Sequence, residues 1–319
     1  MLVKVFRTNG ALQIAIIVVA VAAIWLGWLT RGVEYSTEGG GPVYELLRMV
    51  TRGVPVVATV LGLCLTLAEG YLLNALMYER GLVPLNSLMP MLLYVIYMGI
   101  GGEGLRPVTV ANLWVLLGLR SMMPKENLIL EDSRIFNTGF WCSMAGLTWL
   151  PAIWVVVPMT MGLLTYRMYG GREWSVWTLG WLAPVIVVVT WLFMGDRMWE
   201  IGEYARGVED VAEVWFEGRW PAMVWAGVFW VTGVVMTVGA AGVLEGRTRV
   251  VRKHGMVMGA MLLMGVVGVI YGGVTPVGGG AFAIGMSATG SVFMMEKRKW
   301  LWVYDVIVGL LFAYAVVSG

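Results

Sequence analysis

The feature that most constrains this chain is a series of long apolar segments that recurs along its whole length, separated by short polar connections. An α-helix of about 20 apolar residues is long enough to cross a bilayer. Lipid offers no hydrogen-bond partners to the backbone, so a helix, which satisfies its own backbone groups, is favoured there. The sequence therefore predicts an all-α, polytopic membrane bundle that forms a single integral membrane domain over residues 1–319, with ten or eleven transmembrane helices. We place eleven spans at residues 12–30, 54–77, 86–100, 108–120, 135–149, 151–166, 175–194, 221–243, 256–272, 281–295 and 301–317.

Composition supports this fold class. Hydrophobic residues make up 59% of the chain and charged residues only 13%, whereas soluble domains carry about 25% charged residues. So few charges could not cover the surface of a soluble globule. The net charge of +2 gives no reason to expect a nucleic-acid partner.

The distribution of basic residues predicts the orientation of the chain. Lys4 and Arg7 precede the first span, so the positive-inside rule places the N-terminus in the cytoplasm. With eleven alternating spans, fifteen of the 22 basic residues fall on the cytoplasmic side and the C-terminus lies outside. The seven on the outer side are Arg31, Arg48, Arg52, Arg106, Arg197, Arg206 and Arg219.

One stretch leaves two alternatives open. The apolar run 135–166 is too long for one straight span. Pro151 can begin a second helix, because proline at the first helical position loses no needed hydrogen bond. The run is therefore either two spans or one kinked span.

Two longer connections map to the outer face. Residues 31–52 contain a run of three glycines at 39–41 followed by an amphipathic stretch, and residues 195–220 interleave charged with apolar side chains at near-helical spacing. Such segments are typical of amphipathic helices that lie on a membrane surface. We expect both to be outer-face amphipathic segments.

Few residues are suited to metal or cofactor chemistry. The chain has two cysteines, Cys64 and Cys142, in separate apolar segments, and a single histidine, His254. This set argues against zinc, haem and Ser-His-Asp sites. We expect no metal and no cofactor, and whether the chain is an enzyme stays open.

Glu69 is the strongest candidate for a transport site, because ionisable residues within a bilayer are costly. Gly62, Thr66, Glu69 and Leu73 share one helical face that we expect to point into the bundle. The carboxyl group would carry a proton or bind a cation. The alternative is a neutral or paired glutamate that orders helix packing.

Asparagines and arginines suggest a polar pocket beside Glu69. Asn74, Asn112 and Asn137 lie within or near spans, and Arg134 lies at a cytoplasmic helix end, as does Arg120. The arginines could hold a lipid phosphate bidentately. The alternative is architectural, because asparagines also bond across membrane helices.

A third set of candidates lies in the first outer connection. Glu34 and Glu38 could act as acid and base, and Arg52 could hold a phosphate. This layout is similar to that of integral-membrane glycosyltransferases that use lipid-linked sugars, although their acidic motif usually begins with aspartate. The alternative is that both glutamates are merely solvated.

The central part of the chain, roughly residues 70–195, carries a set of short patterns. They are Leu73-Asn74, Tyr78-Glu79-Arg80, Leu88-Met89-Pro90, Arg134-Ile135-Phe136-Asn137-Thr138-Gly139-Phe140, Leu150-Pro151 and Gly171-Arg172-Glu173-Trp174. In these patterns the chain resembles a family of polytopic inner-membrane proteins of undefined function from Bacteroidetes-type bacteria. The resemblance implies a multi-pass protein of the bacterial inner membrane with periplasmic acidic loops, and it implies no activity.

Three functions remain open at this point. The first, and the one that we expect from the sequence, is the handling of polyprenyl-linked or other lipid-linked envelope intermediates, with a lipid-linked sugar as partner. The second is a proton-coupled transporter of small solutes that uses Glu69. The third is a non-catalytic scaffold that docks envelope proteins. Membrane lipids are partners in all three.

Overall fold

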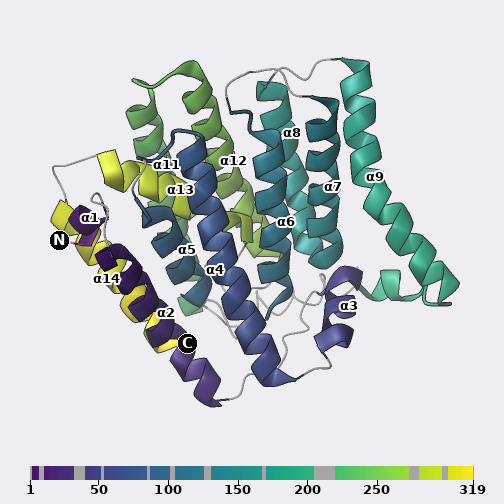
Figure 1. The fold of residues 1–319 in the computed structure, drawn as a ribbon, viewed down its shortest axis with the longest axis horizontal. Helices are drawn as coiled ribbons and strands as arrows, with labels where there is room; N and C mark the ends of the chain where they lie inside the picture. Colours follow the sequence, from purple (N-terminus) through teal and green to yellow (C-terminus); the bar gives the residue numbers. More distant parts are fainter. Residues whose placement is uncertain are drawn as a thin grey trace.

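The computed structural model confirms the all-α class for the residues it describes, which are 2–6, 11–31, 40–51, 54–84, 87–100, 105–125, 131–166, 170–204, 220–272, 280–296 and 301–318. Long helices pack side by side in a bundle, with α3 at one end and α9 at its outer edge (Figure 1). The helices are α1 (Leu2–Val5), α2 (Ala11–Arg31), α3 (Pro42–Thr51), α4 (Pro55–Glu79), α5 (Met89–Ile100), α6 (Pro107–Met122), α7 (Asp132–Thr148), the 3₁₀-helix η1 (Leu150–Val155), α8 (Val156–Thr165), α9 (Gly171–Met194), α11 (Trp220–Leu244), α12 (Arg249–Gly272), α13 (Gly280–Glu296) and α14 (Leu301–Ser318).

Local sequence signals set several helix ends. Pro55 and Pro107 stand at the first turns of α4 and α6, where the missing N–H costs nothing. α4 ends at Glu79, and Gly81, two residues further on, takes φ +67°. The Leu82 N–H donates to the carbonyl of Met77 at 3.0 Å and closes the helix end. Glycine suits this turn because it adopts positive φ without steric cost.

The long helices run between two ends of the bundle. At one end, called the basic end here, Arg134 at the start of α7 donates to carbonyls at the end of α6. At the opposite end, the Tyr44 hydroxyl in α3 donates to the Leu105 carbonyl just before α6, at 2.8 Å. The basic end is the upper end of α4 and α12 in Figure 1.

The run 135–166 forms two antiparallel helical segments, α7 and then η1 with α8. α7 stops at Thr148, Trp149 is extended (φ −145°, ψ 109°), and η1 begins with Leu150. Gly118 of α6 faces both Thr138 of α7 and Met159 of α8. α7 and α8 therefore lie beside the same turn of α6. Pro151 lies in the first turn of η1, as expected for a second helix.

α7 and α9 pack in backbone contact through a pair of glycines. A Cβ atom on Gly139 would lie 2.5 Å from the Trp177 carbonyl oxygen, and one on Gly180 would lie 2.2 Å from the Phe136 carbonyl oxygen. Small residues allow this approach, which is typical of helices that associate in membranes. The contact holds α9 on the edge of the bundle.

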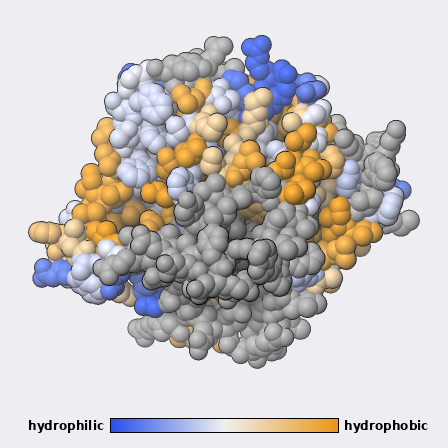
Figure 2. All heavy atoms as spheres, turned by 180° about the vertical axis from the view of Figure 1, so that it is seen from behind, coloured by the Kyte–Doolittle hydropathy of each residue, from blue (hydrophilic) through white to orange (hydrophobic). Residues whose placement is uncertain are grey.

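The surface of the bundle is rich in apolar side chains. On α9, Leu179, Val187 and Phe193 are 60%, 68% and 70% exposed. Among the described residues, which Figure 2 colours by hydropathy, apolar side chains lie on both sides and across the upper half, and the most hydrophilic ones lie at the top and at the lower left edge. Among the described residues, two helical segments, Val56–Glu79 and Gly171–Met194, are long and apolar enough to cross a membrane, and several other apolar helices are shorter.

The two predicted surface segments are described only in part. Within 31–52, residues 42–51 form α3, whose Tyr44 is buried while Leu46 and Met49 are about half exposed. Within 195–220, the chain is described up to residue 204 and again at residue 220. Glu200 there is paired with Arg197. The described parts of both segments lie at the end of the bundle opposite the basic end.

Candidate functional site

Glu69 lies on the side of α4 that faces the bundle interior. Thr66, Glu69 and Leu73 are 3%, 0% and 0% exposed, and Gly62 is buried as well. The Thr66 hydroxyl donates to the Gly62 carbonyl at 2.9 Å, so its polarity is used within the helix. Glu69 is thus the group on this face that must find partners on other helices.

A chain of hydrogen bonds joins three helices at Glu69. The Tyr94 hydroxyl on α5 donates to Glu69 Oε2 at 2.8 Å. Asn112 on α6 donates through Nδ2 to the same hydroxyl oxygen at 2.9 Å and to the Met98 sulfur at 3.4 Å. Tyr94 and Asn112 are 0% and 1% exposed. Buried polar chains of this kind fix side-chain positions because each member requires its neighbour.

The network leaves one carboxyl oxygen unused. Glu69 Oε1 is buried and makes no hydrogen bond to the described residues, nor does Glu69 form a salt bridge with any of them. An isolated carboxylate in apolar surroundings is costly unless it takes up a proton or pairs with a cation. The geometry therefore offers one carboxyl oxygen for a proton or a small cation.

The far end of the network meets α13 and a small cavity. A Cβ atom on Gly280 would lie 1.9 Å from Asn112 Oδ1, so glycine is required for this approach. Asn112, Trp149, Pro151 and Gly280 are among the residues that line a cavity of about 10 Å³. That volume is close to the space of one water molecule. A single water there would touch the network at Asn112.

The other polar residues predicted to line a pocket are not joined to this network. Asn74 is half-buried, and its Oδ1 makes no hydrogen bond to the described residues. Asn137 is exposed on α7. Arg134 donates to the carbonyls of Ser121, Arg120 and Met123 at 2.8, 3.2 and 2.7 Å, so it caps the end of α6. Of the predicted set, the structure brings together Glu69 and Asn112.

Glu34, Glu38 and Arg52 lie outside the described residues. The predicted acid, base and phosphate ligand of an envelope enzyme therefore stay predictions.

Tyr94 is the functional residue that sequence reasoning missed. It lies in the predicted span 86–100, in an apolar stretch that also contains Tyr97. A tyrosine hydroxyl in a buried helix usually needs a partner, so its position was a usable signal. The partner itself depends on how α4 and α5 pack, which one-dimensional spacing does not show.

His254 lies at the basic end, before the apolar part of α12. Its Nδ1 is hydrogen-bonded to the Tyr166 hydroxyl at 2.5 Å. Burial, with a contribution from the nearby charge of Arg80, lowers the pKa of His254 from 6.5 to about 4. The ring is therefore neutral at pH 7. The described residues contain no group of His, Cys, Asp and Glu side chains that could hold a metal ion.

Comparison with known proteins gives no relative. No protein-family model, no curated protein and no solved structure matches the chain.

Proposed function

We propose that this chain is a multi-pass protein of the bacterial inner membrane, with the basic end in the cytoplasm. Several observations support the proposal: two helices of membrane length, exposed apolar side chains on α9, and arginines gathered at one end of the bundle. The expected eleven spans and the periplasmic C-terminus belong to this proposal. So does the inner-membrane family that the central sequence resembles.

We further propose that the protein is a transporter of small solutes in which Glu69 carries a proton or a small cation. The observation that carries this function is the buried chain from Glu69 Oε2 through Tyr94 to Asn112, with Glu69 Oε1 left unpaired. Ionisable groups inside a membrane bundle typically mark ion or proton routes. The water-sized cavity beside Asn112 gives such a route a step toward the end opposite the basic end.

Chemical labelling tests the carrier role without a known substrate. A hydrophobic carbodiimide adds to protonated carboxyl groups that water does not reach. In membranes that contain the full chain, we expect Glu69 to be labelled, as read by peptide mass spectrometry, and labelling to fall as pH rises. Sodium protection at constant pH would identify a cation site, and insensitivity to sodium would identify a proton site. An unlabelled Glu69 at every pH from 5 to 8 would contradict the carrier role.

Three glutamine variants separate the functions left open by the sequence. In a strain that lacks the gene, a transporter requires that Glu69→Gln fails to complement while Glu34→Gln and Glu38→Gln succeed. The reverse pattern would favour the handling of lipid-linked envelope intermediates, with a lipid-linked sugar as partner. Full complementation by all three variants would favour a scaffold that docks envelope proteins.

A further inference from the structure

A second polar group of residues lies at the basic end, apart from Glu69. The Glu79 carboxylate at the end of α4 faces Lys125 at 3.2 Å, Arg120 at 3.5 Å and Arg80 at 3.6 Å. Arg134 joins this group, because Arg134 and Arg80 both donate to the Arg120 carbonyl, at 3.2 and 3.4 Å. We call Arg80, Arg120, Lys125 and Arg134 the arginine cluster.

Positive charge is in excess there. Arg80, Arg120 and Lys125 share Glu79, and Glu131 is the further carboxylate near Arg134. Burial lowers the pKa of Arg80, and the charges of Arg134 and Arg120 lower it further against the opposing effect of Glu79. The arginine cluster therefore contains more positive charges than the two nearby carboxylates can neutralise.

Arg80 is the member that points to a ligand. Its side chain is only 2% exposed, yet Nε and Nη1 make no hydrogen bond to the described residues. A guanidinium group has five N–H donors in a fixed fork, and each buried donor without an acceptor is costly. By contrast, Arg134 donates hydrogen bonds to three carbonyl groups at the end of α6. Among the described residues, the Arg80 Nε–H and the N–H groups of Nη1 have no acceptor within hydrogen-bond distance, and Nη1 lies 3.6 Å from Glu79 Oε2.

The cluster also has an accessible side. The side chains of Arg120 and Lys125 are 49% and 64% exposed, and that of Glu79 is 23% exposed. The exposed side chains of Arg120 and Lys125 are accessible to an anion from solvent, and buried Arg80 adds its positive charge from the inner side. Arginine forks match the oxygen spacing of phosphate groups and bind them bidentately.

We infer that the arginine cluster binds a phosphate group, with Arg80 as the buried ligand and Arg120 and Lys125 as the exposed ones. Two sources share this chemistry: the headgroup of an anionic phospholipid in the cytoplasmic leaflet, and a soluble phosphate. Basic groups at the cytoplasmic end of membrane helices are known to attract anionic lipid. The site does not depend on the role of Glu69, and it stands or falls separately from the transport proposal.

The first arm of the test uses inorganic phosphate. The full-length protein is purified in an uncharged detergent, and its melting temperature is followed by tryptophan fluorescence as phosphate replaces chloride at constant ionic strength. A ligand that binds the folded state raises the melting temperature in a saturable way. If the site binds soluble phosphate, the double variant Arg120→Gln/Lys125→Gln should bind phosphate about tenfold more weakly, or weaker still, than the wild type. A tenfold loss of affinity is equivalent to about 1.4 kcal/mol.

The second arm uses nanodiscs of phosphatidylcholine with and without phosphatidylglycerol. A lipid site requires that phosphatidylglycerol stabilises the wild type but not the double variant. Arg80→Lys keeps the charge and removes the fork, so it should also lose the response in whichever arm succeeds. Arg172→Gln is the matched control, because Arg172 is 82% exposed, pairs with Asp132 and lies outside the cluster.

A response in either arm that the double variant loses and Arg172→Gln keeps supports the inference and names the source. The inference is overturned if the wild type and the double variant respond alike in both arms, or if neither responds. Because Arg120 and Lys125 are exposed, their replacement leaves the buried core intact, and a failure to bind cannot be attributed to unfolding.

Discussion

Tyr94 on α5 and Glu69 on α4 are joined by a hydrogen bond of 2.8 Å from the tyrosine hydroxyl to Oε2, in a part of the bundle where both side chains are fully buried. The same hydroxyl accepts from Asn112, so one oxygen atom connects three helices. Removing this single atom is the most direct test of the site.

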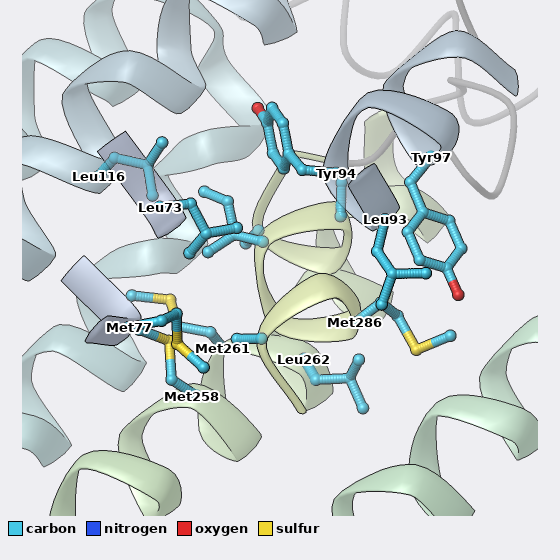
Figure 3. Packing of buried hydrophobic residues seen from close by; sticks show 14 of the residues in the cluster. Leu73, Met77, Leu93, Tyr94, Tyr97, Leu116, Met258, Met261, Leu262 and Met286 are labelled. Atoms are coloured by element: carbon cyan, nitrogen blue, oxygen red, sulfur yellow. The ribbon is translucent and has the colours of Figure 1, made fainter. Parts of the chain in front are cut away.

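Tyr94→Phe should lower the free energy of unfolding by about 1–3 kcal/mol, because it leaves Glu69 Oε2 and Asn112 Nδ2 without their partner. Tyr97→Phe is the matched control. Tyr97 is also buried on α5, but its hydroxyl points in a different direction from that of Tyr94 (Figure 3). Unfolding in mixed micelles measures both changes. Equal losses for the two variants would mean that the network contributes nothing specific.

The single histidine should give stability a defined pH dependence. The folded-state pKa of His254 is about 4 against 6.5 without burial. Between these values the unfolded chain binds more protons, so the free energy of unfolding rises with pH across this window and levels off above it. The slope contributed by one group is at most about 1.4 kcal/mol per pH unit.

Melting temperatures between pH 5 and 7.5 check this prediction. Wild type should gain stability up to about pH 6.5, the unperturbed histidine value. In His254→Gln this part of the slope should vanish. Tyr166→Phe removes the hydrogen bond but keeps the buried ring, so it should retain a rise with pH. An unchanged slope in His254→Gln would assign the effect to carboxyl groups instead.

The glycine pair between α7 and α9 should be intolerant of even one methyl group. Gly139→Ala would place Cβ 2.5 Å from the Trp177 carbonyl oxygen, so the two helices must separate. We expect a loss of about 1–3 kcal/mol in unfolding free energy.

Gly242→Ala provides the comparison for this prediction, since no atom lies within 4 Å of its Cβ position on α11. Alanine is the better helix former there, by about 0.5–1 kcal/mol. Thermal unfolding of both variants in detergent should therefore show opposite signs. A neutral Gly139→Ala would mean that α9 is not held by this contact.

Single cysteines can locate the two ends of the bundle relative to the membrane. In a background of Cys64→Ser and Cys142→Ala, Gly246→Cys lies between α11 and α12 near the basic end, and Met198→Cys lies near the opposite end. A membrane-impermeant maleimide applied to spheroplasts should label position 198 and leave position 246 unlabelled until the membrane is opened. Labelling of both positions in intact spheroplasts would contradict the proposed threading.

Sequence reasoning predicted the helices well where apolar length alone decides them. The span expected at 54–77 corresponds to α4 at Pro55–Glu79, and the run 135–166 divides at Trp149 into α7 and the segment of η1 and α8. Helix ends that depend on turn chemistry differ by a few residues, as at the end of α4, which lies at Glu79 rather than residue 77.

The site was only half visible in the sequence. The polarity of Glu69 and Asn112 marked them as candidates, because carboxyl and amide groups are costly in lipid. Two polar residues meet only if their helices are neighbours and are rotated toward each other. Both conditions follow from the packing of all side chains in the bundle. For this reason Tyr94 was missed, and Arg134, expected beside a pocket, instead caps α6.

The turn between α7 and η1 has a consequence for how the protein is made. Trp149 is the one residue between the two helices; it is 3% exposed, and the Thr148 carbonyl beside it accepts from the Gly41 N–H at 2.8 Å. The single connecting residue is too short to form a loop on the far side of a bilayer while the second helix is being synthesised. In the proposed membrane setting, residues 132–165 would have to leave the translocon together as a preformed helical hairpin, and an insertion between Thr148 and Leu150 would be expected to stall biogenesis before folding begins.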